Sequence, residues 1–307
     1  MRKIRRGTAE VNSVEDRIQN RSRTIPFLNV ILTINELMED IKLIKLIEIL
    51  RTMKSAVLAY SGGVDSTLLL KALQISDIRT LAVTSISEKT PQNDLLMAKK
   101  LAAKLGIEHR IIETDELSTE EFVSNTSERC FFCKDELFRK LSDVAKSEGY
   151  MFLLDGSNQD DLLDYRPGLR AATKYNVRSP LVEASLSKKE IREISRQLGL
   201  STWDRPASPC LSSRFPYGQR ITKDALKRVE KAEEFLREIG FHNVRVRDHD
   251  EVARIEVGEE EIDLVSAPKR RKLISEKLKS LGYKFISLDL DGYRTGSMNR
   301  TIETTLT

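Results

Sequence analysis

The fold of this chain is decided by residues 55–73, which read SAVLAYSGGVDSTLLLKAL. Residues 55–60 form a short apolar run, which is typical of a strand that is buried on both faces of a parallel sheet. Residues 67–73 have the composition of a helix, and a pair of glycines separates the two elements. The stretch therefore predicts a strand, a tight turn and a helix in direct succession.

Further strands and helices alternate along the chain around this unit. The sequence predicts strands over residues 80–84, 110–112 and 151–154, and helices over 34–53, 93–105, 187–198 and from Lys134 onward. Such alternation predicts an α/β fold with a doubly wound parallel sheet. In sheets of this kind ligands bind at the carboxyl ends of the strands, which is where residues 61–66 are expected.

The pattern changes after residue 200. Residues 201–220 contain three prolines and one glycine, which indicates a stiff, irregular loop. The elements that the sequence predicts after this loop are a helix over 222–239, strands near 243–247 and 252–257, helices near 259–266 and 270–280, and a strand over 284–288. We therefore expect a smaller C-terminal α+β domain.

The formal net charge of +4 is carried entirely by residues 1–23, so the remainder of the chain is neutral. The absence of net positive charge in residues 24–307 argues against a protein that binds a nucleic-acid backbone. No segment approaches the ~20 apolar residues of a membrane helix, and no signal-peptide core follows the basic start. The odd number of cysteines, three, argues against a disulfide framework. We expect a cytoplasmic protein that binds neither nucleic acid nor membrane.

Residues 61–66, Ser-Gly-Gly-Val-Asp-Ser, have the chemistry of an anion-binding loop. The glycines let the backbone turn tightly, the amides and the helix N-terminus attract phosphate, and two hydroxyls add donors. Asp65 would repel phosphate unless it holds Mg²⁺ or orients the loop. A bare Gly-Gly pair would indicate an ordinary turn, but the whole hexapeptide between a strand and a helix favours a phosphate site. No Gly-Lys dipeptide occurs, which excludes a kinase-type P-loop.

The hexapeptide resembles the loop of the PP-loop, or N-type ATP pyrophosphatase, superfamily. The resemblance implies that a substrate oxygen attacks the α-phosphorus of ATP and that pyrophosphate departs. The residues that it assigns to ATP and pyrophosphate are Ser61, Gly62, Gly63, Asp65 and Ser66. Asp65 is expected to be catalytic, with Mg²⁺ as the cofactor. Residues 155–161, DGSNQDD, fit the superfamily's second nucleotide patch through Gly156 and Asn158, although alone they would equally suit a polar turn.

The three cysteines carry the second chemical signal. Cys130 and Cys133 form a Cys-x-x-Cys pair at the start of a helix, and Cys210 lies in the proline-rich loop. Such a pair can be a metal clip, a redox pair or two packed thiols. A structural zinc site requires four ligands, whereas three thiolates suit a [4Fe–4S] cluster with one open iron. Arginines at positions 205, 214 and 220 are expected to favour the thiolate of Cys210.

These motifs together resemble one family, the LarE-type sulfur transferases, from about residue 36 to 300. The segments that carry the resemblance are the hexapeptide, the Cys130–Cys133 pair, residues 187–200, the loop 206–218 and the tail 288–299, LDLDGYRTGSMN. The family implies adenylation of a carboxylate of pyridinium-3,5-biscarboxylic acid mononucleotide. Sulfur then replaces the adenylate, and the product serves nickel-pincer nucleotide cofactor biosynthesis.

The resemblance leaves two sources for the sulfur. In one branch of the family, the cysteine in the place of Cys210 gives up its own sulfur and becomes dehydroalanine. In the other branch, cysteines in the places of Cys130, Cys133 and Cys210 hold a [4Fe–4S] cluster that is fed by a sulfide donor. Since this sequence has all three cysteines, the cluster branch is favoured.

A nucleotide substrate needs cationic partners beyond the ATP loop. The candidates are Arg214, Arg245, Arg247, Arg294 and Ser297. Arg245 and Arg247 alternate on a predicted strand, so their side chains point to the same face. The ordinary interpretation of a single arginine is a solvated surface charge, but the family-like segments around Arg214 and Arg294 favour a binding role.

The resemblance divides the chain into three parts. Residues 1–35 form a basic N-terminal extension that is expected to be disordered, residues 36–199 a PP-loop ATP-binding domain, and residues 200–307 the active-site loop and a C-terminal α+β substrate domain. The expected partner is a small-molecule nucleotide substrate, and a homo-oligomer is compatible with the sequence. Two other functions remain open at this point, namely a PP-loop tRNA thiolase and a non-catalytic module that binds an adenine nucleotide.

Overall fold

The computed structural model describes residues 30–163, 166–206 and 209–294. Most of the expected N-terminal extension lies outside these residues, as does Ser297. The described chain forms two compact units, each of which is described by itself. The first falls within Met1–Ile86, Gln92–Thr114 and Lys134–Ala207, and the second within Ser87–Pro91, Asp115–Cys133 and Ser208–Thr307.

The first unit contains a four-stranded parallel sheet in the order β3-β2-β1-β4, which confirms the predicted fold class. Its strands are β1 (Ser55–Ala59), β2 (Arg79–Ile86), β3 (Glu108–Glu113) and β4 (Phe152–Leu154). Strand β1 pairs with β2 from Ser55 to Ala59 and with β4 from Ala56 to Leu58. Because β1 lies between two other strands, it is apolar. The loop after β1 therefore lies at the carboxyl edge of the sheet, between the ends of β2 and β4.

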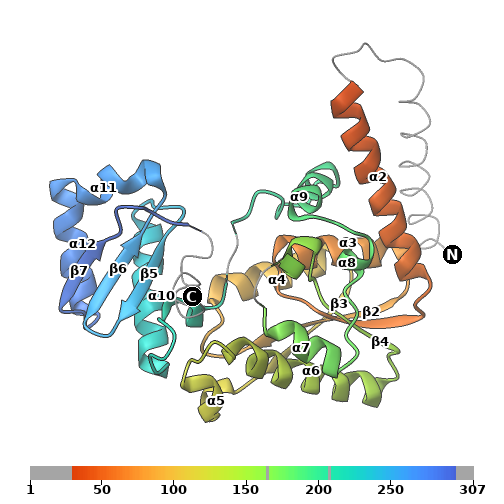
Figure 1. The fold of residues 1–307 in the computed structure, drawn as a ribbon, viewed down its shortest axis with the longest axis horizontal. Coiled ribbons are helices and arrows are strands. Elements are labelled where there is room, and N and C mark those ends of the chain that lie inside the picture. The colour runs from red at the N-terminus through yellow and green to blue at the C-terminus, as the bar shows by residue number, and fades with distance from the viewer. Residues whose placement is uncertain (1–29, 164–165, 207–208, 295–307) are drawn as a thin grey trace. The chain divides into compact units, whose positions relative to one another are not determined.

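Helices cover both faces of this sheet (Figure 1). On one face lie α2 (Val30–Arg51), α3 (Val64–Ser76) and α9 (Lys188–Gln197), and on the other α6 (Arg129–Glu148) and α7 (Gly168–Lys174). The remaining elements of the unit are α4 (Gln92–Leu105), η3 (Gln159–Leu163) and α8 (Pro180–Glu183). Within the described ranges, none of the helices combines the length and the apolar content that crossing a membrane requires.

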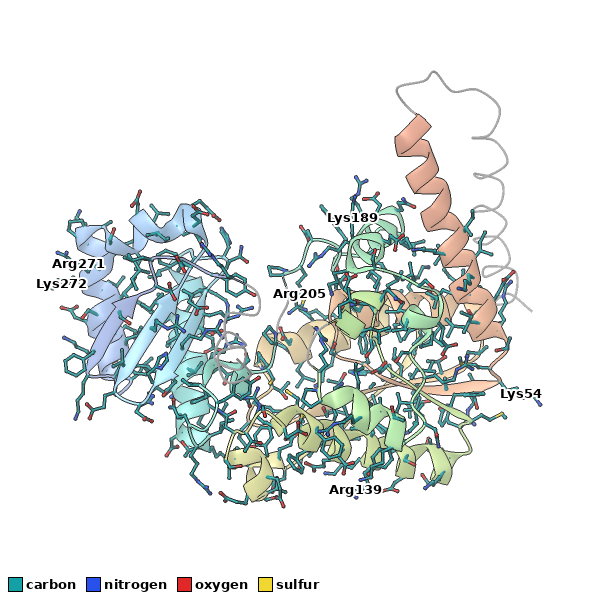
Figure 2. The ribbon with its side chains drawn as sticks, in the orientation of Figure 1. Lys54, Arg139, Lys189, Arg205, Arg271 and Lys272 are labelled. Atoms are coloured by element: carbon teal, nitrogen blue, oxygen red, sulfur yellow. The ribbon has the colours of Figure 1, made fainter. Side chains whose placement is uncertain are left out.

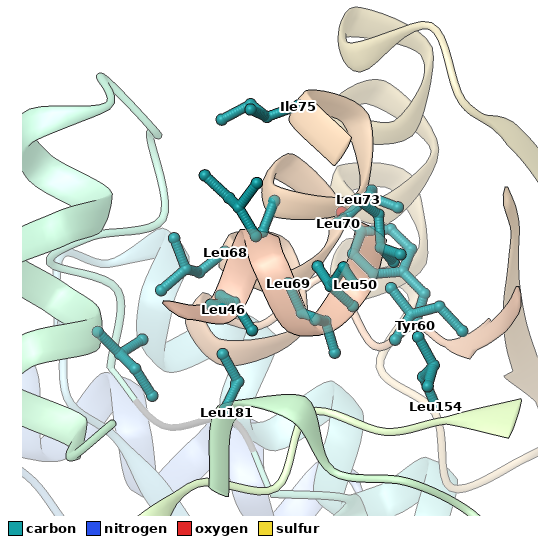
Figure 3. Packing of buried hydrophobic residues seen from close by; sticks show 14 of the residues in the cluster. Leu46, Leu50, Tyr60, Leu68, Leu69, Leu70, Leu73, Ile75, Leu154 and Leu181 are labelled. Atoms are coloured by element: carbon teal, nitrogen blue, oxygen red, sulfur yellow. The ribbon is translucent and has the colours of Figure 1, made fainter. Parts of the chain in front are cut away.

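The core of the first unit fixes the helix that follows the glycine loop. Leu69 and Leu70 of α3 are fully buried in one cluster with Leu46 and Leu50 of α2 and Leu154 of β4 (Figure 3). Burying a side chain of this size stabilises the folded state by about 1.5–3 kcal/mol. The N-terminus of α3, which follows the loop, is therefore anchored by packing on both the sheet and α2.

The second unit contains a three-stranded mixed sheet in the order β5-β6-β7. Strand β5 (Arg245–His249) is antiparallel to β6 (Val252–Glu256), which is parallel to β7 (Phe285–Leu288). The helices and 3₁₀ turns of the unit are η2 (Glu116–Ser118), α5 (Glu120–Val123), η4 (Leu211–Arg214), α10 (Lys223–Glu238), η5 (Glu259–Glu261), α11 (Ile262–Ser266) and α12 (Pro268–Ser280). The predicted small α+β fold is therefore present after residue 200.

The second unit is not one continuous stretch of the chain. Residues 87–91, which follow β2, and residues 115–133, which include the first turn of α6, group with the C-terminal part. The three cysteines consequently belong to the same unit, whereas the loop 61–66 belongs to the other. The division into domains at residue 199 stays a prediction.

Candidate active site

The loop Ser61–Ser66 joins β1 to α3 at the carboxyl edge of the parallel sheet. Gly62 has a φ of +72°, and a Cβ atom there would approach the Cβ of Ala98 to 3.0 Å. The amide of Gly63 donates to Ser61 Oγ at 3.3 Å, and Ser61 Oγ lies 3.1 Å from Ser66 Oγ. The loop thus gathers two hydroxyls at the N-terminus of a helix, an arrangement that binds phosphate groups.

The segment 155–161 follows β4 and lies against this loop. A Cβ atom on Gly156 would lie 3.1 Å from the backbone nitrogen of Ser66, so a glycine is needed for the two backbones to approach this closely. The side-chain amide of Asn158 donates to Oδ1 of Asp65 at 3.2 Å. The structure therefore brings together the two motifs that the sequence analysis assigned to ATP.

Lys188 also belongs to this site, although the sequence analysis did not identify it. It is the first residue of α9, and Ser187 and Glu190 form the capping box that begins this helix. The ammonium of Lys188 forms an ion pair with Oδ2 of Asp65, and its amide donates to Oδ2 of Asp160 at 2.8 Å. The capping box was visible in the sequence, but nothing in helical spacing reveals a partner 123 positions away.

A second carboxylate, that of Asp161, lies near Asp65. Its Oδ2 accepts a hydrogen bond of 3.0 Å from the amide of Asn158, and its Oδ1 pairs with Arg166 at 2.8 Å. Burial raises the pKa of Asp161, and the negative charge of Asp65 adds to this effect, while the amide and Arg166 oppose it. The two carboxylates repel each other, and a divalent cation would relieve that repulsion.

In the second unit, two buried cations lie among the thiols. Lys89 is 8% exposed and Arg129 is 5% exposed. Nη2 of Arg129 lies 3.9 Å from Sγ of Cys130, and Nη1 donates at 2.8 Å to the carbonyl of Ser212, two residues after Cys210. Burial alone would lower the pKa of Arg129, but negative charge on Cys210 and Cys130 raises it above its ordinary value. Arg129 therefore faces both thiols.

The structure does not support the expected [4Fe–4S] cluster. Among the described residues, no group of three or more His, Cys, Asp or Glu side chains is arranged to hold a metal ion. Sγ of Cys133 lies 3.8 Å from Oε1 of Glu116, within the distance of a long hydrogen bond. Cys130 is exposed, whereas Cys133 and Cys210 are partly buried.

Two of the three arginines that were expected beside the Cys210 thiol have other partners. Arg205, which is labelled in Figure 2, belongs to the first unit. It donates to the carbonyl of Gly62 at 3.3 Å. Arg220 is exposed and forms a surface ion pair. Arg214 lies near Cys210: its Nη1 donates to the carbonyl of that residue at 3.2 Å, and although burial alone would lower the pKa of Arg214, attraction first to Glu233 and then to Cys210 raises it. The interaction of Arg214 with Cys210 agrees with the expectation, whereas Lys89 and Arg129, two further buried cations near the thiols, come from segments remote from residue 210.

Three of the arginines expected to bind substrate lie in one buried network. Arg214 pairs with Glu233 at 2.7 Å, and Arg247 pairs with Glu256 at 2.6 Å. Burial lowers the pKa of Arg245, and the positive charge of Arg214 lowers it further, while Glu233 opposes this effect. An anion beside Arg245 would relieve the cost of holding its charge in this network.

Of the other two candidates, Arg294 lies within the described residues. The side chain of Arg294 is 57% exposed and lies 3.8 Å from Asp291. Its neighbour Tyr293 lies beneath the guanidinium of Arg245, which is 5.0 Å from the ring centre, so this end of the described chain reaches the buried network. Ser297 lies outside the described residues.

The chain is similar to known proteins over most of its length. The profile of the family described as asparagine synthase matches residues 51–207. The pyridinium-3,5-bisthiocarboxylic acid mononucleotide synthase of Lactiplantibacillus plantarum is 38% identical over 84% of this chain and 93% of its own length. An alignment that covers 84% of this chain must include both the loop 61–66 and Cys210.

Two uncharacterized proteins extend this similarity to other organisms. The protein slr1717 of Synechocystis is 41% identical over 86% of this chain and 99% of its own length. The protein MJ0830 of Methanocaldococcus jannaschii is 35% identical over 79% of this chain and 92% of its own length. The similarity therefore concerns whole chains and not the nucleotide-binding segment alone.

Proposed function

The chain belongs to the PP-loop family of ATP pyrophosphatases that the asparagine synthase profile describes, and we propose that it is an ATP-dependent sulfur transferase. The substrate is pyridinium-3,5-biscarboxylic acid mononucleotide, of which one carboxylate becomes a thiocarboxylate for nickel-pincer nucleotide cofactor biosynthesis. The observation that carries this proposal is the 38% identity to a synthase of the corresponding bisthiocarboxylic acid, over 93% of that protein.

The first half-reaction activates the carboxylate. Its oxygen attacks the α-phosphorus of ATP, the bond to the oxygen that bridges the α- and β-phosphates breaks, and pyrophosphate departs. The hydroxyls and the helix N-terminus at Ser61–Ser66 support this role, because they offer donors that are in place before the charge develops. Asp65, with Asp161 nearby, would hold Mg²⁺, which usually takes one or two protein carboxylates and neutralises phosphate charge when bound.

The second half-reaction transfers sulfur from the protein itself. Cys210 attacks the activated carboxyl carbon, and AMP leaves with the electrons of the broken C–O bond. Loss of the Cα proton of Cys210 and cleavage of its Cβ–S bond then release the thiocarboxylate and leave dehydroalanine. This route needs one thiol and no iron. It is favoured over the cluster route because two buried cations, Lys89 and Arg129, lie near the thiols, and because the described residues form no metal-ligand group.

The phosphate of the substrate is assigned to the buried arginine network. Arg245 and Arg247 stand two positions apart on β5, so their side chains leave the strand on the same face. The lowered pKa of Arg245, which arises from burial and from Arg214, favours a bound anion. Arg294 and Ser297, which follow Tyr293, complete this proposed set.

The test is release of pyrophosphate from ATP and Mg²⁺ in the presence of the pyridinium dicarboxylate mononucleotide. We expect release that depends on the substrate and falls by about 10²-fold or more in Asp65→Ala. Asp143→Ala, which removes an exposed carboxylate of α6, is the matched control and should leave the rate unchanged. Release with unmodified tRNA in place of the pyridinium nucleotide would point to a thiolase, and no release with either would point to a binding module.

A further inference from the structure

Lys89 is a buried lysine that takes no part in either of the proposed half-reactions. It lies in the turn after β2, where the amide of Thr90 donates to the carbonyl of Ser87 at 2.9 Å. Only 8% of the residue is exposed. Its ammonium forms an ion pair with Glu116 and donates to Oγ of Ser87 at 3.2 Å. The ammonium is therefore fixed in place by two partners inside the second unit.

The segment that carries Cys210 is attached directly to Lys89. The amide of Leu211 donates to the carbonyl of Lys89 at 3.1 Å, so the residue after Cys210 is hydrogen-bonded to the backbone of this lysine. On the other side, Oε1 of Glu116 accepts from both the ammonium of Lys89 and, at 3.8 Å, the thiol of Cys133. Lys89 therefore stands between the segments that bear two of the three thiols.

The charge of Lys89 is retained despite its burial. Burial alone would lower the pKa of its ammonium, but electrostatic attraction to Cys133, Glu116 and Cys210 raises it above the ordinary value. A buried ion pair contributes little net stability, because desolvation of both charges offsets their attraction. Stability therefore does not explain why a charged pair is buried here. A role in chemistry on a negatively charged sulfur does explain it.

We propose that Lys89, held by Glu116, is a positioning residue for sulfur transfer that supplies positive potential at the sulfurs of Cys210 and Cys133. This inference rests on the proposed function for the identity of the reaction. In that reaction the sulfur of Cys210 carries negative charge twice, when it attacks the activated carboxyl carbon and when it leaves as the thiocarboxylate. A fixed ammonium stabilises both forms of the sulfur. Arg129 adds positive charge near Cys130 and Cys210.

The test compares a neutral and an anionic thiol reagent on the full chain without ATP or substrate. Iodoacetamide, which is neutral, and iodoacetate, which is anionic, alkylate the same sulfur. A change in the solvent access of the sulfur affects both rates, so the ratio of the two rates reports the local electrostatic potential. We expect Lys89→Met to lower the iodoacetate-to-iodoacetamide ratio at Cys210 by about five-fold, the factor that corresponds to ~1 kcal/mol of attraction between two close unit charges in water. Lys89→Arg should restore the ratio, as read for each cysteine by peptide mass spectrometry.

Two matched controls sharpen this test. Lys223→Met removes an ammonium that is exposed and pairs with Glu88, the neighbour of Lys89, and should leave the ratio at Cys210 unchanged. Glu116→Gln keeps the ammonium and removes its carboxylate, so the ratio at Cys133 should rise. An unchanged ratio at Cys210 in Lys89→Met, or no rescue by Lys89→Arg, would overturn the inference.

The role of Lys89 and the proposed reaction can fail separately. If the chain forms no thiocarboxylate but the ratios change as expected, the electrostatic role of Lys89 stands and the identity of the reaction falls. If the chain forms thiocarboxylate but the ratios do not respond to Lys89, the reaction stands and the role of Lys89 falls.

Discussion

The side-chain amide of Asn158 donates a hydrogen bond of 3.2 Å to Oδ1 of Asp65, although the two residues are 93 positions apart. The other oxygen of the same carboxylate pairs with Lys188. A neutral donor from the segment after β4 and a cation from the start of α9 therefore hold Asp65 at the N-terminus of α3. The carboxylate is oriented by the protein, which is what a group that positions a metal or a phosphate requires.

Loss of the Asn158 hydrogen bond should slow ATP cleavage. In Asn158→Ala, Asp65 keeps its charge but loses one of the two partners that orient it, so we expect pyrophosphate release to fall by about ten-fold. The measurement is the substrate-dependent rate of pyrophosphate release. Gln159→Ala is the matched control, because the neighbouring side chain is exposed. Equal rates in Asn158→Ala and the wild type would mean that the orientation of Asp65 does not depend on this amide.

Loss of the Lys188 ammonium should weaken ATP binding. In Lys188→Met the carboxylate of Asp65 is left without its cation beside the phosphate loop, so we expect the KM for ATP to rise about ten-fold, which corresponds to ~1.4 kcal/mol. Lys189→Met is the control, since Lys189 is exposed on α9 (Figure 2). If both variants raise KM equally, general surface charge and not the pair with Asp65 is responsible.

The sequence predicted the parallel sheet and the ATP loop because both are encoded locally. An apolar strand, two glycines and a helix follow one another within residues 55–73, and the structure keeps this order as β1, loop and α3. Lys188 escaped prediction because its partner Asp65 is supplied by the tertiary fold. The role of Gly156 in binding the nucleotide stays a prediction, to which the structure adds a close backbone approach to Ser66.

The second unit was predicted less well at the level of single side chains. Its order of helices and strands follows from local patterns, but the positive charge around the thiols comes from Lys89 and Arg129, in segments that group with the C-terminal part only after folding. Arg205 and Arg220 are closer to Cys210 in sequence, yet they pair elsewhere. Proximity along the chain is a poor guide to electrostatic neighbours here, because residues 115–133 group with the C-terminal part of the chain and not with the segments next to them in sequence.

The buried pair of Arg214 and Glu233 should be important for stability. Glu233→Gln would leave the guanidinium of Arg214 buried without its carboxylate, so we expect the free energy of unfolding to fall by about 3–5 kcal/mol. Urea denaturation at neutral pH measures this quantity. Glu234→Gln changes an exposed neighbour on the same helix and should alter it by less than about 0.5 kcal/mol.

The same pair predicts a dependence on pH. Burial alone would raise the pKa of Glu233, but the attraction of Arg214 and its hydrogen bonds bring it below the ordinary value of 4.5. The folded chain therefore loses this proton more readily than the unfolded chain, so the stabilisation is fully present above pH 4.5 and is lost as the pH falls through the folded value. The stability difference between wild type and Glu233→Gln should shrink on acidification. A difference that grows as the pH falls would contradict this assignment.

The central claim, that Cys210 is the sulfur source, is tested most directly by intact-mass spectrometry after reaction with ATP, Mg²⁺ and the pyridinium dicarboxylate mononucleotide. The wild type should lose the mass of one H₂S and form at most one thiocarboxylate per chain, and Cys130→Ala and Cys133→Ala should do the same. Cys210→Ala should release pyrophosphate but keep its mass and form no thiocarboxylate. Repeated thiocarboxylate formation by a chain of unchanged mass, with about four iron and four sulfide per chain, would contradict the account.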